Sequence, residues 1–403
     1  MEDVKLGLKE NFNQFFLLVI INGFVGGMVG LERTILPQIA EHEFNINVKT
    51  SILSFIVVFG ISKAVTNYFT GALSNKTGRK NLLILGWLFG LPVPVILMTA
   101  NSWNQIMAAN VLLGINQGLA WSSTVIMKID LAGEKQRGFA MGINEFAGYL
   151  SVAVIAFFTG MIADKYSLRP YPFYIGIVLA IAGLLLSLLF VKDTRHHVKK
   201  ETQTNIQKRL KNIFWETTWK NKNLGSVTQA GLINNFNDGV VWGLFPLLLA
   251  SKQLSLKQIG IVVSIYPGIW GIGQLFTGKM GDVFSKKTLL VTGMLLQAAA
   301  LLFFPFVSSL TGFIILSALL GLGTAVVYPV FLAAIADYTN PLDRAQSIGV
   351  FRLWRDLGYA IGALITGIIA DRTNIHTAIV FTGLITMLSA AILQTRMEKQ
   401  GEL

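Results

Sequence analysis

Twelve long apolar runs divide this chain of 403 residues and strongly limit what it can fold into. A helix needs about 20 mostly apolar residues to cross a bilayer, because the hydrocarbon core cannot satisfy backbone polar groups. Charged residues make up 13% of the chain, whereas soluble proteins carry about 25%. The predicted helices cover residues 13–36, 50–72, 81–100, 105–128, 139–162, 171–191, 226–249, 255–277, 288–308, 311–335, 346–368 and 375–395. We therefore expect an all-α, multi-pass membrane protein.

Basic residues are distributed unevenly between the predicted loops. With both termini on one side of the membrane, 23 of the 33 lysines and arginines lie on that side and six on the other. Cytoplasmic loops are enriched in Lys and Arg, so both termini are predicted to be cytoplasmic. The formal charge of +12 then reflects topology, and no nucleic-acid partner is expected. The N-terminal segment is too acidic and too polar for a cleaved signal, so the first helix is expected to remain in the mature protein.

An internal repeat relates the two halves of the chain at an offset of 207 residues. Phe-Thr-Gly at 69–71 recurs at 276–278, and Ile-Ala-Asp at 162–164 recurs at 369–371. Six helices therefore repeat as six in the same orientation, which is one design of secondary transporters.

The repeat predicts three parts of the chain. Two six-helix bundles cover residues 1–191 and 226–403, and a basic cytoplasmic linker covers 192–225. Within the linker, the amphipathic fragment 208–215 is expected to lie along the membrane interface, unless the linker is simply a solvated tether.

The turn after the second predicted helix carries a recognisable motif. Residues 71–80 read GALSNKTGRK, and residues 278–287 read GKMGDVFSKK. This pattern resembles the signature loop of the major facilitator superfamily, G-x-L-x-D-R-x-G-R-K, although Asn75 stands where the family has Asp. The resemblance covers nearly the whole chain. It implies two six-helix bundles that rock around a central site in alternating access.

The resemblance also implies a cytoplasmic gate. In relatives, the loop carboxylate and nearby charges latch the cytoplasmic side. The matching candidates here are Arg79, Asp130, Arg137, Asp282, Asp337 and Arg344. The alternative is that these are ordinary charged turn residues.

Two departures from the family pattern concern function. Asn110 stands four residues before Gly114, where the family's fourth helix often carries an arginine. Drug antiporters often carry G-x-x-x-G-P in the fifth helix, and residues 139–162 contain no proline. Both departures weaken an assignment as a standard drug/proton antiporter.

Ionisable side chains inside the predicted helices indicate a specific role. Placing each one at the centre of a membrane helix costs at least about 2.5–3.5 kcal/mol of insertion free energy. Eight stand out: Glu32, Arg33, Lys63, Glu145, Asp238, Arg352, Arg355 and Asp356. One interpretation is pairwise neutralisation in dry packing, with Lys63 and Asp356 as a resting pair. The other is that they gather at a shared central pocket.

The three charged residues in the predicted helix 346–368 predict the class of substrate. Arg352, Arg355 and Asp356 lie three and four residues apart on one helix, so one carboxylate faces two arginines. Spare guanidinium and ammonium groups suit carboxylate or phosphate. We therefore expect an anionic or zwitterionic solute at the midplane. The candidate substrate-binding residues are Lys63, Asn116, Gln117, Trp121, Asn234, Asn237, Trp270, Gln274, Arg352 and Arg355.

Buried carboxylates could couple transport to protons, since burial favours their neutral form and a nearby arginine favours the charged form. Glu32, Glu145 and Asp238 suit this role, and Asp356 suits it less because adjacent cations outnumber it. Sodium coupling stays open. The chain has no cysteine, so no thiolate metal site is expected, and neither a metal nor a cofactor is predicted beyond the ion gradient.

The sequence thus predicts a proton-coupled secondary transporter in a bacterial-type inner membrane, with export slightly favoured. A multidrug/proton antiporter that exports hydrophobic or cationic compounds is one alternative, and a substrate sensor or lipid scramblase on the same scaffold is another. An enzyme is not expected, because no paired catalytic His/Asp set, Walker loop or metal-ligand spacing appears. The expected partners are a small solute and the lipid bilayer, and we expect a monomer.

Overall fold

The computed structural model describes residues 7–132, 137–194, 210–339 and 341–398. Within these ranges the chain is helical throughout its regular structure and contains no strand, which confirms the predicted all-α fold class.

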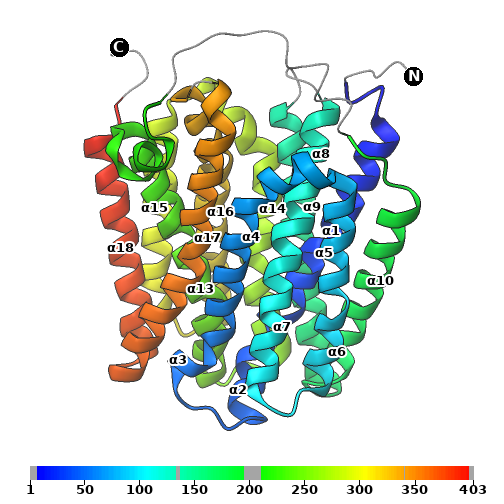
Figure 1. The fold of residues 1–403 in the computed structure, drawn as a ribbon. Coiled ribbons are helices and arrows are strands. Elements are labelled where there is room, and N and C mark those ends of the chain that lie inside the picture. Colours follow the sequence, from blue (N-terminus) through cyan, green and yellow to red (C-terminus); the bar gives the residue numbers. More distant parts are fainter. Residues whose placement is uncertain (1–6, 133–136, 195–209, 340, 399–403) are drawn as a thin grey trace.

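The first half of the chain forms a series of long helices with short breaks (Figure 1). Its elements are α1 Phe12–Arg33, α2 Leu36–His42, α3 Lys49–Ile52, α4 Ser54–Thr77, α5 Arg79–Gly90, α6 Pro92–Thr99, α7 Trp103–Asn116, the π-helix η1 Gln117–Trp121, α8 Ser122–Ala132, α9 Arg137–Lys165, the 3-10 turn η3 Tyr171–Phe173 and α10 Tyr174–Leu189.

The second half is similar, with fewer interruptions. Its elements are α12 Ile213–Trp215, the π-helix η4 Glu216–Lys220, α13 Lys222–Ser251, α14 Leu256–Val283, α15 Lys286–Phe303, the 3-10 turn η5 Phe304–Phe306, α16 Leu310–Asp337, α17 Pro341–Arg372 and α18 Ile375–Arg396. Together, the two halves place helix at every one of the twelve predicted positions.

Local sequence explains where the predicted boundaries shift. The predicted helix 81–100 is divided into α5 and α6 at Pro92, because proline has no amide to continue the hydrogen-bond ladder. Helix α13 begins four residues earlier than predicted. The Asn221 side chain caps it by accepting from the amides of Asn223 and Leu224, each at 3.0 Å.

Nine helical stretches in the described part of the chain are long and apolar enough to cross a membrane by length and composition. The three predicted spans outside this set, at 50–72, 105–128 and 226–249, each contain several amide and hydroxyl side chains. Their polar residues are mostly buried inside the bundle, as at Asn116 and Asn237. A polar helix can therefore sit at the centre of a membrane protein when its neighbours shield it from lipid.

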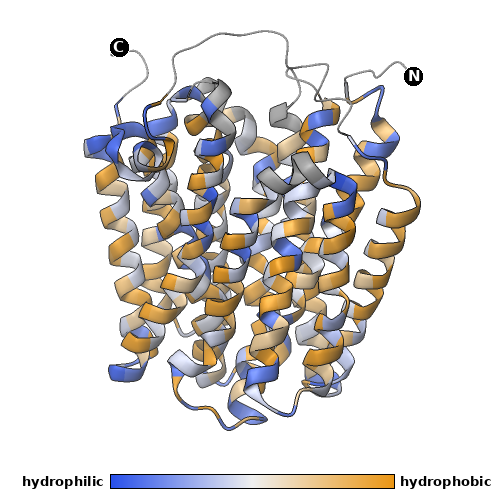
Figure 2. Ribbon diagram, viewed as in Figure 1, coloured by the Kyte–Doolittle hydropathy of each residue, from blue (hydrophilic) through white to orange (hydrophobic). Residues whose placement is uncertain are grey.

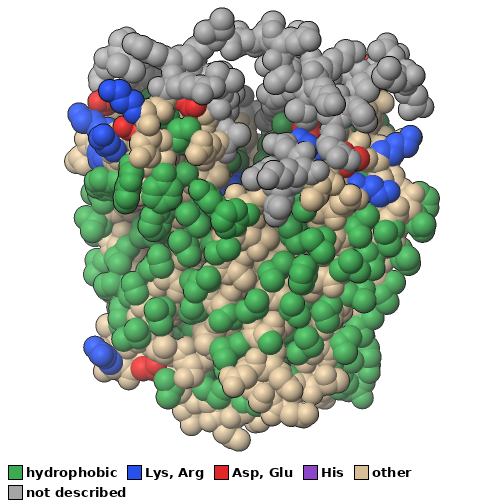
Figure 3. Space-filling view, in the orientation of Figure 1, with side chains coloured by type: hydrophobic (Ala, Val, Ile, Leu, Met, Phe, Trp, Pro, Cys, Tyr) green, Lys and Arg blue, Asp and Glu red, His purple; other side chains and the backbone are tan. Residues whose placement is uncertain are grey.

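The helices of the two halves stand side by side and meet along two seams. Helix α9 packs against α14, and α4 packs against α17. Hydrophobic residues cover the outer faces of the helices, and polar residues gather at the two ends of the bundle (Figure 2). A broad apolar belt lies between these ends, and exposed Lys, Arg, Asp and Glu side chains lie above and below it (Figure 3). The molecule is built to span a bilayer with its polar chemistry inside.

Candidate functional site

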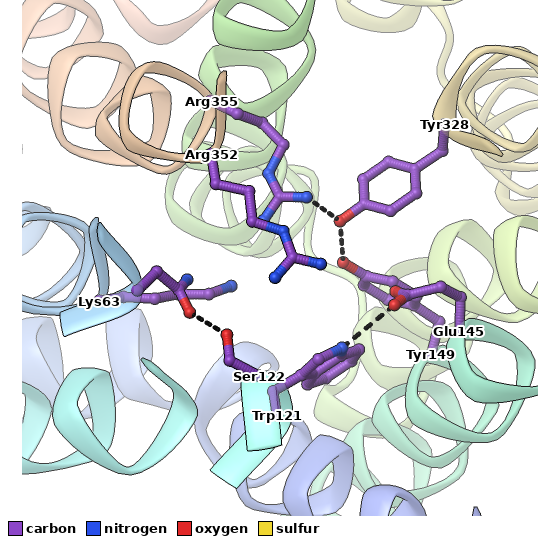
Figure 4. A pocket seen from close by; sticks show the side chains of 9 residues that line it. Lys63, Trp121, Ser122, Glu145, Tyr149, Tyr328, Arg352 and Arg355 are labelled. Carbon is purple, nitrogen blue, oxygen red and sulfur yellow. Dashed lines mark hydrogen bonds between the residues drawn. The ribbon is translucent and has the colours of Figure 1, made fainter. Parts of the chain in front are cut away.

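A small cavity of about 20 Å³ lies between the two halves of the chain (Figure 4). Its walls come from both halves of the chain. The lining residues lie on α4, η1, α8, α9, α16 and α17. They are Lys63, Asn67, Trp121, Ser122, Glu145, Tyr149, Tyr328, Arg352 and Arg355. Four of the eight ionisable residues singled out from the sequence thus share one cavity.

Two of the three cations at this cavity form no ion pair within the part of the chain that the structure describes. Among the described residues, neither Lys63 nor Arg352 has an ion-pair partner. The Lys63 ammonium lies over aromatic faces instead, 4.9 Å from the ring centre of Tyr359 and 5.5 Å from that of Phe59. The guanidinium of Arg352 points into the middle of the cavity (Figure 4). Both groups are available to an anion.

Arg355, the third cation, is held in place. It donates from Nε at 2.9 Å and from Nη2 at 2.7 Å to the same oxygen of Asp356, and from Nη1 to the Tyr328 hydroxyl at 2.9 Å. Asp356 also accepts from the side-chain amide of Asn67 at 2.6 Å. The resting pair predicted between Lys63 and Asp356 is therefore wrong in this state. The neighbouring guanidinium reaches Asp356 through two donors, which a single ammonium cannot match.

The acidic side of the cavity belongs to Glu145. Its Oε1 accepts from the indole of Trp121 at 3.2 Å and from Asn144 at 2.7 Å. Its Oε2 is buried and has no hydrogen-bond partner within the described part of the chain. Glu145 and Arg352 are equivalent under the 207-residue offset, so the repeat places opposite charges on opposite walls of one cavity.

Aromatic rings form a continuous wall beside these charges. Tyr149 stacks on Trp270 with ring centres 3.5 Å apart, and its hydroxyl lies 3.2 Å from that of Tyr328. Trp121 ends the π-helix η1 and packs on Tyr149 at 5.2 Å. π-Helical turns often occur at functional sites, because the extra residue redirects a side chain. Trp270 itself is fully buried behind Tyr149 rather than lining the cavity.

Several predicted binding residues lie away from the cavity. The amide of Asn116 donates to the Gly86 carbonyl at 2.9 Å, and that of Gln117 donates to the Val25 carbonyl, also at 2.9 Å. Gln274 is buried and is not among the lining residues. The first two side chains connect neighbouring helices, and Nε2 of Gln274 has no hydrogen-bond partner among the described residues.

The asparagines of α13 are also engaged elsewhere. Asn237 donates to Gln297 at 2.9 Å and accepts from Thr386 at 2.8 Å, while Gln297 donates to Asn234 at 3.0 Å. This polar ladder joins α13 to α15 and α18 inside the second half. Asn234 and Asn237 therefore act as interhelical connections in this state.

Two candidate coupling residues form a separate buried group. Glu32 accepts from Asn110 at 3.1 Å, and its other oxygen lies 3.7 Å from the guanidinium of Arg33. That guanidinium stacks over Trp242 at 4.0 Å, a residue of the other half. Asp238 accepts from the hydroxyl of Tyr266. Neither Glu32 nor Asp238 lines the central cavity, so the predicted coupling residues are divided between two places.

The candidate gate residues that the structure describes form ion pairs within each half. Arg79 Nε lies 3.2 Å from Asp130, and Lys286 Nζ lies 2.5 Å from Asp337. The offset of 207 carries the first pair onto the second. The candidates Arg137, Asp282 and Arg344 lie outside the described side chains.

Sequence reasoning missed four lining residues: Asn67, Ser122, Tyr149 and Tyr328. The repeat itself holds a signal for one of them, since the offset of 207 carries Trp121 onto Tyr328. Asn67 lies four residues after Lys63 on α4 and hence on the same helix face. Nothing in the residue types of Ser122 or Tyr149 distinguishes them from neighbours on the same helices.

Comparison with known proteins gives relatives over nearly the full length. The flippase LtaA of Staphylococcus haemolyticus, named as a proton-coupled antiporter, is 26% identical over 381 residues, covering 91% of this chain and 89% of that protein. The multidrug resistance protein MdtG of Enterobacter lignolyticus is 22% identical over 356 residues, covering 87% of this chain and 82% of that protein.

Two solved structures share the fold. The human organic anion transporter MFSD10 (TETRAN) gives a TM-score of 0.71 at 16% identity, covering 94% of this chain and 99% of that one. A POT family transporter in complex with a thioalcohol-conjugated peptide gives 0.77 at 13% identity, covering 96% of this chain and 97% of that one. At these identities the likeness concerns the fold alone.

A family model described as Major Facilitator Superfamily matches residues 15–231 and again residues 227–402. The matches extend over nearly the whole chain, and the helices and the two seams agree with them. The chain therefore belongs to the major facilitator superfamily, whose members are multi-pass membrane transporters and not enzymes.

Proposed function

We propose that this transporter moves a small organic anion or zwitterion by alternating access between the two halves. The observation that carries the proposal is a pair of cations at one central cavity, Lys63 and Arg352, that form no ion pair with any described residue. Burying a cation without a partner costs several kcal/mol per ion, so the site is poised for an incoming negative group. Arg offers a planar fork for a carboxylate or phosphate, and Lys offers a mobile point charge.

The charge balance of the cavity supports an anion. Lys63, Arg352 and Arg355 face two carboxylates, Glu145 and Asp356, and one of these is already bonded to Arg355. One positive charge is left over when all five groups are ionised. A monoanion neutralises it. A zwitterion leaves the net charge unchanged, but its anionic group can pair with the spare cation and its own cation with the free oxygen of Glu145.

The rest of the lining suits an organic body. Trp121, Tyr149 and Tyr328 offer aromatic faces, and Ser122 and the tyrosines offer hydroxyl groups. Pockets for small molecules combine mostly apolar walls with a few polar groups that fix orientation. The substrate is thus an anionic or zwitterionic molecule with an apolar or ring-shaped part.

Proton coupling is the second part of the proposal. Glu32 and Asp238 are fully buried, and each has one oxygen without a hydrogen-bond partner among the described residues. Such carboxylates can take up and release a proton as the halves move. The name of the relative LtaA, a proton-coupled antiporter flippase, agrees with this role. Sodium remains the alternative ion, and no cofactor is proposed.

Placement in the membrane follows from the basic loops. We propose that both termini are cytoplasmic, that the membrane is a bacterial inner membrane, and that the protein is a monomer of two bundles, 1–191 and 226–403.

Transport by purified protein in proteoliposomes tests the proposal. Lys63→Ala and Arg355→Ala should each abolish flux of an anionic solute, because one removes a free cation and the other releases Asp356 and Tyr328. Lys165→Ala removes an exposed cation and serves as the matched control, with unchanged flux expected.

A multidrug exporter is the second candidate, favoured by the aromatic wall and by relatives named as multidrug resistance proteins. Transport of a cationic dye that survives both Lys63→Ala and Arg355→Ala would contradict the anion proposal and support this one. A substrate sensor or lipid scramblase would show no solute accumulation at all under an imposed proton gradient.

A further inference from the structure

Two copies of one short motif mark the two seams at the end of the bundle opposite the chain termini (Figure 1). Residues 159–164 read TGMIAD near the end of α9, and residues 366–371 read TGIIAD near the end of α17. The 207-residue offset relates the two copies. Neither copy takes part in the proposed substrate site.

At the α17 copy, a carboxylate crosses from the second half to the first. The backbone amides of Lys49 and Thr50 donate to the two oxygens of Asp371, the second at 2.8 Å. The Thr50 hydroxyl donates as well, at 2.6 Å. Gly367, one turn before Asp371, allows this approach, because a Cβ there would stand 2.8 Å from the Thr50 Cα.

At the α9 copy, a single backbone contact of this kind recurs in the opposite direction. The amide of Lys257, in the first turn of α14, donates to Asp164 at 3.4 Å. Gly160 allows the approach, since a Cβ there would lie 3.0 Å from the Gly260 Cα. The offset of 207 carries Thr50 onto Lys257, so donor, acceptor and glycine all correspond. The longer distance makes this the weaker of the two contacts.

We propose that Asp164 and Asp371 are twin clasps that hold the bundle closed at this end and release when it opens. Each carboxylate bridges one seam between the halves, Asp371 to α3 and Asp164 to α14. The end they join is closed in this structure, since Leu53 is fully buried and lies against Gly243 of α13. Alternating access requires these contacts to break. Hydrogen bonds to a charged acceptor are roughly twice as strong as neutral ones, so these contacts favour the closed form.

Single-cysteine labelling tests the clasps without knowledge of the substrate. The chain has no cysteine, so Leu53→Cys places the only thiol at the closed end. In nanodiscs, its reaction with a maleimide proceeds at a rate set by the population of the open form. In this background, Asp371→Ala should raise the labelling rate about tenfold or more, as expected for loss of hydrogen bonds to a charged group. Asp164→Ala should raise it less, and the double variant should show the product of the two increases.

Three further variants keep the test specific. Asp371→Asn retains one acceptor oxygen and should give a smaller increase than Asp371→Ala. Thr50→Val removes the hydroxyl donor alone and should give a partial increase, which also serves if the alanine variant does not fold. Arg372→Gln neutralises the exposed neighbouring charge and should leave the rate unchanged.

Three labelling results would contradict the proposal or a part of it. Labelling rates of both aspartate variants within twofold of the Leu53→Cys parent would overturn the proposal. An unchanged rate in Asp164→Ala alone would contradict the pairing of the two clasps. An equal rise in Arg372→Gln would assign the effect to net charge instead.

Discussion

At the scale of single residues, Arg352 and Arg355 show how one helix divides two similar side chains between different tasks. Arg355 is bonded to Asp356 and Tyr328, whereas Arg352 is unpartnered among the described residues. The sequence predicts that both arginines lie near Asp356. Their spacing alone does not decide which of the two forms the ion pair with this carboxylate. Arg355, directly beside Asp356 in the chain, forms the ion pair, and Arg352 faces the cavity.

Arg352→Lys tests this division of tasks. Lysine keeps the charge and loses the planar fork, so we expect the KM for an anionic solute to rise about tenfold or more while the protein stays folded. Initial-rate transport in proteoliposomes measures the change, with Lys252→Ala on the exposed surface as control. An unchanged KM would mean that Arg352 does not contact the solute.

At the scale of helices, the sequence predicts well where along the chain each span lies. It predicts poorly how each helix is rotated about its own axis. The apolar runs mark where each helix crosses, and a cap such as Asn221 or a break such as Pro92 adjusts the ends. The direction in which a polar residue points depends on packing with neighbouring helices, which no run of residues encodes by itself. Asn234 and Asn237, predicted to bind the solute, therefore contact side chains of α15 and α18 in this state.

The polar ladder of α13 gives a prediction about stability. Gln297→Leu removes the group that joins Asn234 to Asn237 and leaves both amides buried without it. We expect unfolding to become easier by about 1–2 kcal/mol, with the KM for the solute unchanged. Denaturant unfolding in detergent, compared with transport, measures both quantities. A large change in KM at constant stability would place this ladder in the binding site after all.

At the scale of the whole molecule, the repeat proved more informative than any single motif. The offset found in the sequence relates the ion pairs Arg79–Asp130 and Lys286–Asp337 in space, and it relates Glu145 to Arg352 across the cavity. Equivalent positions thus carry either the same chemistry, where both halves need it, or opposite charges, where they face each other. The division of the buried acids between the cavity and the group around Glu32 could not be predicted, because it depends on how two bundles meet.

Proton coupling is a property of the whole cycle and predicts a specific phenotype. Glu32→Gln or Asp238→Asn removes a buried group that can exchange a proton, and both changes conserve shape. We expect solute exchange at equal pH to persist while accumulation driven by a pH gradient is lost. Flux that is unaffected by collapse of the gradient in the parent protein would contradict proton coupling.

Ligand-induced stabilisation of the purified protein tests most directly whether the cations around this cavity bind an anion. A true ligand raises the melting temperature by mass action, so a library of anionic, zwitterionic and cationic solutes can be screened against the parent protein and the double variant Lys63→Ala/Arg352→Gln. We predict that anionic or zwitterionic solutes raise the Tm of the parent and leave that of the variant unchanged. Stabilisation of the parent by cationic compounds alone, or equal stabilisation of both proteins by an anion, would contradict it.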